Sequence, residues 1–265
     1  MNKLDFPKGV TPLDIFISSI EKERFTEELD GSNAKVDYGS VYKERDIELK
    51  LLLKANDTRD YRLIRDAVYD MFSVTDTLYI AEEYQPGKVF HVSVSASYIP
   101  ERYDNNQRFA EAEMECEIVG LPFSRSIGTT QDIEEHGLLY SQELWAYGMG
   151  LEYTKESQKY THNRLEFSIY NAGNVGIHPF EQDLNIKLGN IGKGYTLINE
   201  TTGDKFKYDG RTTGDFELKG PNMTMKGLQA FRDTNRRYIT LAPGWNHFNQ
   251  NKAKEVSFDF PFYYR

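Results

Sequence analysis

Hydrophobic and polar residues alternate along residues 46–55 with a period of two. This period places every second side chain on the same face of a strand. The pattern therefore predicts a β-strand with one buried face, formed by Ile47, Leu49, Leu51 and Leu53.

After residue 55 the spacing of apolar residues changes to three or four, which is typical of one side of a helix. Asp57 or Thr58 can accept a hydrogen bond from the first free amides of such a helix. We therefore expect a capped helix that buries Tyr61, Ile64, Val68, Met71 and Phe72.

The next segments favour strands again. A short β-like stretch covers residues 78–81, and Pro86 and Gly87 favour a turn at 85–88. Two long strands are expected at 89–98 and 108–120, joined by a polar loop. Together with the first strand and the helix, these elements predict one α+β unit.

The chain after residue 163 contains short strand patterns separated by turn residues such as Pro243 and Gly244. Many short strands between such turns favour a β-sandwich. We therefore predict a mainly β chain with one helix, divided into an α+β domain at 1–130, a connector at 131–162 and a sandwich at 163–265. The expected sandwich strands are 165–170, 184–188, 195–199, 205–208, 215–219, 224–226, 238–241 and 256–263.

Several of these segments also carry a family resemblance. Similarity to the N-terminal domain of siphophage distal tail proteins is carried by RDIELKLLLKANDTRDYRLIRDAVYDMF, LYIAEEYQPGKVFHVSVSASY and RFAEAEMECEIVGLPF. Similarity to the galectin-like or jelly-roll-like C-terminal domain of the same family is carried by LEFSIYNAGNVGIHPFEQDLNIKLGN, LINETTGDKF, TLAPGWNHF and VSFDFPFYYR. Together these segments extend over nearly the whole chain.

The resemblance implies a structural hub at the tip of a long non-contractile phage tail. On this interpretation the N-terminal domain forms a homohexameric ring around the DNA path, and DNA is only passing cargo. The ring would join the tail tube protein to the tail-associated tip protein and the receptor-binding protein, with the C-terminal sandwich as docking platform for host attachment. The length of 265 residues matches the short type without an inserted sugar-binding module.

Composition is consistent with this expectation. The hydrophobic fraction of 39% and the aromatic fraction of 14% can fill β-rich cores. The 32 basic residues are scattered among 41 acidic ones, which argues against a general nucleic-acid-binding surface. Cys116 is the only cysteine, so no intramolecular disulfide forms, and we expect a buried thiol and assembly in the reducing cytoplasm of the host. The sequence contains no apolar stretch long enough to cross a bilayer, so no membrane insertion is expected.

The sequence contains no motif of a common enzyme class. The five histidines form no close metal-ligand pair, and no nucleophile elbow or phosphate-binding loop occurs. Residues 30–37 have spaced oxygen ligands but lack the twelfth-position acid of a calcium loop, so a hairpin turn explains them better. We therefore expect no catalytic residue, metal or cofactor. A wall-degrading glycosidase stays as an alternative because its two carboxylates can be distant in sequence.

The strand at 109–119 has an unusual pattern, because one side is apolar and the other side consists of Glu111, Glu113, Glu115 and Glu117. Four like charges on one strand face repel one another unless water or cations separate them. Three explanations are open: a hydrated sheet face, the lining of a channel that repels DNA phosphate, and a contact with cations of a neighbouring subunit.

Trp245, His247 and Phe248 are expected in the turn at Pro243 and Gly244. Exposed aromatic rings at such a place can stack on a sugar, whereas rings packed over the core would be structural. A carbohydrate-binding adsorption module is therefore the second functional hypothesis. The sequence determines neither the host, nor its receptor, nor the receptor-binding partner, nor whether rings stack.

Overall fold

The computed structural model describes residues 4–29, 34–103, 108–138 and 144–265. These residues form two compact units. The N-terminal unit contains the chain up to residue 82 together with 90–122, and the C-terminal unit contains residues 83–89 together with 123–265. The predicted mainly β fold is confirmed, although the described residues contain two α-helices where the sequence predicted one.

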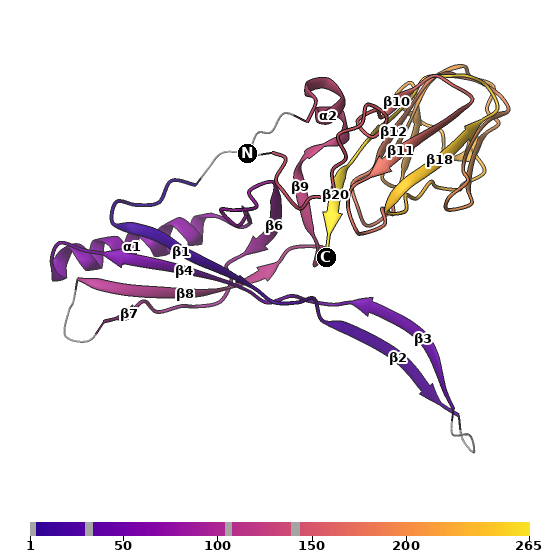
Figure 1. Cartoon of the computed structure of the whole chain (residues 1–265). Coiled ribbons are helices and arrows are strands. Elements are labelled where there is room, and N and C mark those ends of the chain that lie inside the picture. The colour runs from indigo at the N-terminus through magenta and orange to yellow at the C-terminus, as the bar shows by residue number, and fades with distance from the viewer. Residues whose placement is uncertain (1–3, 30–33, 104–107, 139–143) are drawn as a thin grey trace. The chain divides into compact units, whose positions relative to one another are not determined.

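An antiparallel sheet forms the N-terminal unit (Figure 1). Its longest strands are β1 (Val10–Ile17), β4 (Ile47–Lys54) and β8 (Phe109–Ile118), which neighbour one another in that order, with β1 at the edge. β6 (Lys88–Ser93) enters this unit at Phe90 and pairs with β8, while β5 (Leu78–Ile80) pairs with β6 and β7 (Glu101–Arg102) pairs with β8. The predicted strand at 89–98 therefore ends early, at Ser93, whereas the strands predicted at 46–55 and 108–120 are present.

Helix α1 (Thr58–Val74) covers one face of this sheet (Figure 1). Its start is fixed by Asp57, whose carboxylate accepts hydrogen bonds from the backbone amides of Arg59 and Asp60 at 2.7 and 2.9 Å. These bonds satisfy amides that have no partner inside the helix, as the sequence predicted. The buried side of α1 packs on the apolar side of β4 and β8, and it consists of Tyr61, Ile64, Val68 and Phe72.

β2 (Lys22–Glu28) and β3 (Lys35–Tyr42) form a two-stranded hairpin that pairs with no other strand in the described part of the chain (Figure 1). Ion pairs join the two strands, between Arg24 and Asp37 at 2.5 Å and between Lys35 and Glu28 at 2.6 Å. The predicted hairpin is thus present, but residues 30–33 of its turn lie outside the described residues.

The C-terminal unit is mainly a sandwich of two antiparallel sheets. One sheet has the order β10 (Thr161–His162), β19 (Val256–Asp259), β12 (Asn185–Ile191), β15 (Gly214–Lys219), β16 (Asn222–Met225) and β17 (Leu228–Gln229). The other sheet has the order β11 (Glu166–Asn171), β18 (Gly244–Gln250), β13 (Tyr195–Asn199) and β14 (Asp204–Tyr208). A 3₁₀ turn, η1, covers Phe231–Asp233.

Aromatic side chains hold the two sheets together. Phe258 of β19 packs against both Phe248 and Phe167 of the facing sheet, with ring centroids 4.8 and 6.2 Å from its own. Phe206 of β14 meets Phe216 of β15 in the same way at 5.2 Å. Rings that meet at these distances stabilise the sandwich beyond the burial of their apolar area.

Three further elements belong to the C-terminal unit: β9 (Ser124–Thr129), α2 (Thr130–His136) and β20 (Pro261–Tyr264), which pairs with β9. The helix α2 corrects the prediction of a single helix, because seven residues are too few for a periodic apolar pattern. The Thr130 amide donates to the Phe260 carbonyl at 3.0 Å, which ties α2 to the C-terminal strands. Residues of the expected connector are buried here, namely Ile133, Trp145, Met149 and Tyr160.

The sandwich strands deviate from the predictions at several places. Residues 238–241 form only an isolated bridge, from Leu241 to Ile177. The predicted strand at 256–263 is divided into β19 and β20 around Phe260, because these two strands pair with different neighbours. β18 was not predicted, since Trp245, His247 and Phe248 were expected in the turn at Pro243 and Gly244. The predicted domain boundaries at 130 and 162 stay a prediction.

Candidate functional site: the acidic sheet face

β8 exposes its glutamates on the sheet face opposite α1. The side chains of Ala110, Ala112, Met114 and Cys116 are buried against the helix. Glu113, Glu115 and Glu117 are exposed on the other side, and Glu111 is half-buried there. The predicted alternation is therefore present, and α1 leaves the charged face uncovered.

The neighbouring strands add charged residues to the same face. Residues that pair directly across antiparallel strands share a face. The register pairs Glu115 with Glu48, Glu113 with Lys50 and Lys50 in turn with Asp14, while Glu101 of β7 pairs with Glu111. We call this surface the acidic face; it consists of Lys50 and the carboxylates of Asp14, Glu48, Glu101, Glu111, Glu113, Glu115 and Glu117.

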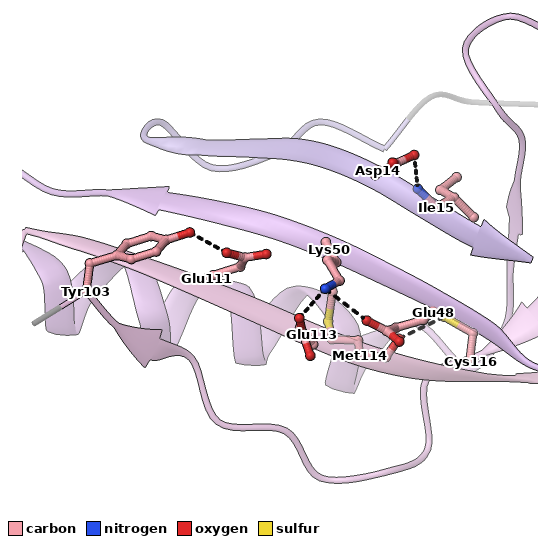
Figure 2. A network of polar contacts seen from close by, with 9 residues as sticks. All are labelled: Asp14, Ile15, Glu48, Lys50, Tyr103, Glu111, Glu113, Met114 and Cys116. Carbon is pink, nitrogen blue, oxygen red and sulfur yellow. Dashed lines mark hydrogen bonds and ion pairs between the residues drawn. The ribbon is translucent and has the colours of Figure 1, made fainter.

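Lys50 is the cation at the centre of the acidic face (Figure 2). Its ammonium donates to the Glu113 carboxylate and lies 3.5 Å from the carboxylate of Glu48. The same ammonium lies 5.0 Å from the ring centroid of Phe16. The hydrogen bond that Lys50 donates to Glu113 raises the pKa of Lys50, so the ammonium stays charged and offsets part of the repulsion.

Tyr103 makes a second polar contact on the acidic face, because its hydroxyl donates to the Glu111 carboxylate (Figure 2). This hydrogen bond raises the pKa of Tyr103. Glu111 and Glu113 thus have hydrogen-bond partners within the unit. For Glu115 and Glu117, the described residues contain no ion-pair partner.

A groove of about 430 Å³ runs between β8 and residues 96–103. Carboxylates from three strands line it, and its lining includes Glu48, Ser97, Glu101, Tyr103, Glu111 and Glu115. Within the described ranges no group of three histidine, cysteine or acidic side chains is arranged to hold a metal ion. The carboxylates of the acidic face therefore act through their negative electrostatic potential, which extends over a broad, solvent-exposed surface.

The second set of predicted site residues does not share one face. Trp245, His247 and Phe248 lie on β18, not in a turn, so consecutive side chains point to opposite sides. Phe248 is buried in the sandwich core and cannot stack on a sugar, which corrects its predicted role. On the outer side, Trp245 meets the ring of Tyr170 at 5.1 Å, and His247 Nδ1 lies 2.8 Å from Ser168 Oγ.

Sequence reasoning missed four members of the acidic face, namely Asp14, Glu48, Lys50 and Glu101, and it missed Tyr103 as the partner of Glu111. The period-two pattern of residues 46–55 already placed Lys50 opposite the buried side of its strand. The register between strands distant in sequence was not available, and register decides which charges become neighbours.

Other sequence-based expectations can be compared with the described residues. Cys116 is buried, as predicted, and burial raises the pKa of its thiol to about 11. Among the described residues, no helix is long and apolar enough to cross a membrane.

Comparison with known proteins relates this chain to phage tail proteins in two ways. Residues 9–116 match the family model of the phage tail protein RIFT-related domain. A search of curated proteins gives no match. Among solved structures, the fold is similar to that of the Dit protein of phage SPP1, described as a paradigm of the hub adsorption apparatus in phages that infect Gram-positive hosts. The TM-score is 0.62 at 12% identity, and the alignment covers 96% of this chain and 93% of the SPP1 chain.

Two structures of the phage p2 baseplate in its activated conformation, with Sr and with Ca, are also similar at 10% identity. They cover 96% of this chain and 90% of the matched chain, with TM-scores of 0.41 and 0.42. Residues 9–116 therefore match the phage tail protein RIFT-related domain, and the chain has a fold similar to that of SPP1 Dit, as the resemblance to phage distal tail proteins predicted.

Proposed function

We propose that the protein is a distal tail protein, the structural hub at the tip of a long non-contractile phage tail. The observation that carries this proposal is the phage tail domain at residues 9–116, whose sheet has one face packed on α1 and the other face open and acidic. The partners would be the tail tube protein, the tail-associated tip protein and the receptor-binding protein. The virion tail tip is the proposed location, after assembly in the host cytoplasm.

The N-terminal unit offers surfaces for a homohexameric ring. A cyclic ring needs two different complementary surfaces on each copy. β1 ends the sheet on one side in the described part of the chain, and an unpaired strand edge can accept a strand of another copy. The β2–β3 hairpin exposes the side chains of Phe25, Tyr38 and Val41, although an isolated two-stranded hairpin is only marginally stable in water. A neighbouring copy would cover them.

Within this ring the acidic face would line the DNA channel. A subunit contact through this face would need cations from the neighbour, because Lys50 already interacts with Glu113 and Glu48 of its own chain. A channel wall needs no such partner, since its carboxylates stay hydrated. Like charges on the wall and on the phosphates would keep passing DNA from binding.

The test is the combined variant in which Glu111, Glu113, Glu115 and Glu117 become glutamine. Native mass and negative-stain images should show an intact hexameric ring for this variant, because wall charges make no contact between copies. DNA retention by the ring should rise at low salt and fall as salt is added. The matched control carries the same four charge losses at exposed sandwich positions, Glu166, Glu181, Glu200 and Glu255, and should not change DNA retention.

Two other outcomes would reject the channel wall. A shift from hexamer to monomer in the quadruple variant would assign the acidic face to a subunit contact. An intact ring with unchanged DNA retention would leave a merely hydrated face. A native mass of monomer for the unmodified chain, under every condition tried, would contradict the hub proposal itself.

The hub proposal also expects no enzymatic activity. The purified protein should not clear a turbid suspension of host cell walls and should not hydrolyse nucleotides. Clearing that disappears with a single carboxylate substitution would favour the glycosidase alternative. The carbohydrate-binding alternative loses one of its three residues, because Phe248 belongs to the core.

A further inference from the structure

Residues 231–238 form an ordered segment on the edge of the sandwich. Backbone hydrogen bonds attach the segment to β14 and the residue after it, from the Asn235 amide to the Lys207 carbonyl at 3.0 Å and from the Asp209 amide to the Asp233 carbonyl at 2.8 Å. The Asn235 side chain adds two bonds, to the Lys205 carbonyl at 2.7 Å and from the Lys207 amide at 3.0 Å. These hydrogen bonds hold the backbone of the segment in place, and with it the positions from which its side chains extend.

This segment completes a row of aromatic rings that reaches solvent. Phe180 meets Tyr238 edge to face at 4.6 Å, and Tyr238 lies 6.4 Å from Phe231. The guanidinium of Arg236 follows at 5.9 Å from the centroid of the Phe231 ring. The side chain of Phe180 is 58% exposed, so the row is not part of the core.

Three exposed arginines lie within six residues of the same segment: Arg232, Arg236 and Arg237. None of them forms an ion pair with another described residue, although the chain carries a formal charge of −9. Arg236 has a positive φ of 59°, a backbone conformation that is costly for a residue with a Cβ atom. Its amide donates to Thr234 Oγ1 at 3.1 Å, which holds this turn.

We call Phe180, Phe231, Tyr238, Arg232, Arg236 and Arg237 the aromatic–arginine patch. We infer that this patch docks an acidic segment of a partner tail protein. The inference deepens the proposed hub function, because it names a docking surface on the sandwich and the chemistry of its partner.

Two properties of the patch favour this occupant. Aromatic residues and arginine are enriched where binding energy concentrates in protein interfaces. Unpaired guanidiniums are complementary to carboxylates, which they can bind through two parallel hydrogen bonds. A sugar would instead need mixed donors and acceptors around the rings, and the amide of Asn235 is already used by the backbone of β14.

The test measures binding of a fluorescent copolymer of glutamate and tyrosine to the full chain by anisotropy. Charge reversal of the three arginines (R232E, R236E and R237E) should weaken binding at least about tenfold. The matched control reverses three exposed lysines of the same sandwich, Lys187, Lys193 and Lys219, and should weaken binding less than about twofold. Phe180→Ala should weaken binding about threefold or more and leave its salt dependence unchanged, because it removes contact and not charge.

Three results would overturn the inference. An equal loss of copolymer affinity in the lysine control would show that binding is only non-specific electrostatic attraction. Binding of heparin without binding of the copolymer would indicate an anionic glycan. A change of native mass on reversing the arginines would make the patch a contact between copies. Native mass also distinguishes a failure of this inference from a failure of the hub proposal. An intact ring that does not bind the copolymer would contradict the docking inference alone, and a chain that binds the copolymer but forms no ring would contradict the hub proposal alone.

Discussion

Replacing Phe258 with alanine removes the ring at the centre of the sandwich core. Phe258 is fully buried and meets Phe248 and Phe167 of the opposite sheet. A substitution of phenylalanine by alanine in a core typically costs about 3–5 kcal/mol, because the transfer free energy is lost and a cavity remains. We expect a value in the upper half of this range, since two ring contacts are lost together.

The assay is urea unfolding followed by tryptophan fluorescence. Both tryptophans of the chain, Trp145 and Trp245, belong to the C-terminal unit and therefore report on that unit. With a slope of about 2 kcal/mol per M urea, a loss of about 4 kcal/mol lowers the midpoint by about 2 M. Phe180→Ala is the matched control, because it deletes the same atoms from a side chain that is 58% exposed, and its midpoint should change by less than about 0.5 M.

A shift of less than about 0.5 M for Phe258→Ala would refute the reasoning. It would mean that the two sheets do not depend on this contact, or that the site collapses without a cavity. A lowered slope with an unchanged midpoint would instead indicate a change in the denatured state or the loss of two-state unfolding.

Two further predictions concern Cys116 and the expected connector. The thiol of Cys116 should not react with a disulfide reagent at pH 8 in the native protein and should react fully in denaturant, because burial raises its pKa to about 11; fast reaction of the native protein would contradict this. Trypsin should cut first at Lys155, which is exposed within residues 128–160, and the two fragments should stay together until denatured because Thr130 is hydrogen-bonded to Phe260. A first cut inside β8, read by mass spectrometry, would show that the chain is divided elsewhere.

The sequence alone determined those parts of the protein in which a local pattern is sufficient. The strand at 46–55, the helix capped by Asp57 and the glutamate strand β8 were predicted because one buried face imposes a period on consecutive residues. The resemblance to distal tail proteins was also readable, because it combined many such segments.

The tertiary structure decided which segments become neighbours. β18 was missed because its polar and aromatic residues resemble a turn until β11 and β13 pair with it on either side. Phe248 belongs to the core and Trp245 to the outer face for the same reason, since the pairing fixes which side of the strand is buried. The acidic face and the aromatic–arginine patch unite residues from distant segments, and only the register of the sheets and the path of the loops bring those residues together.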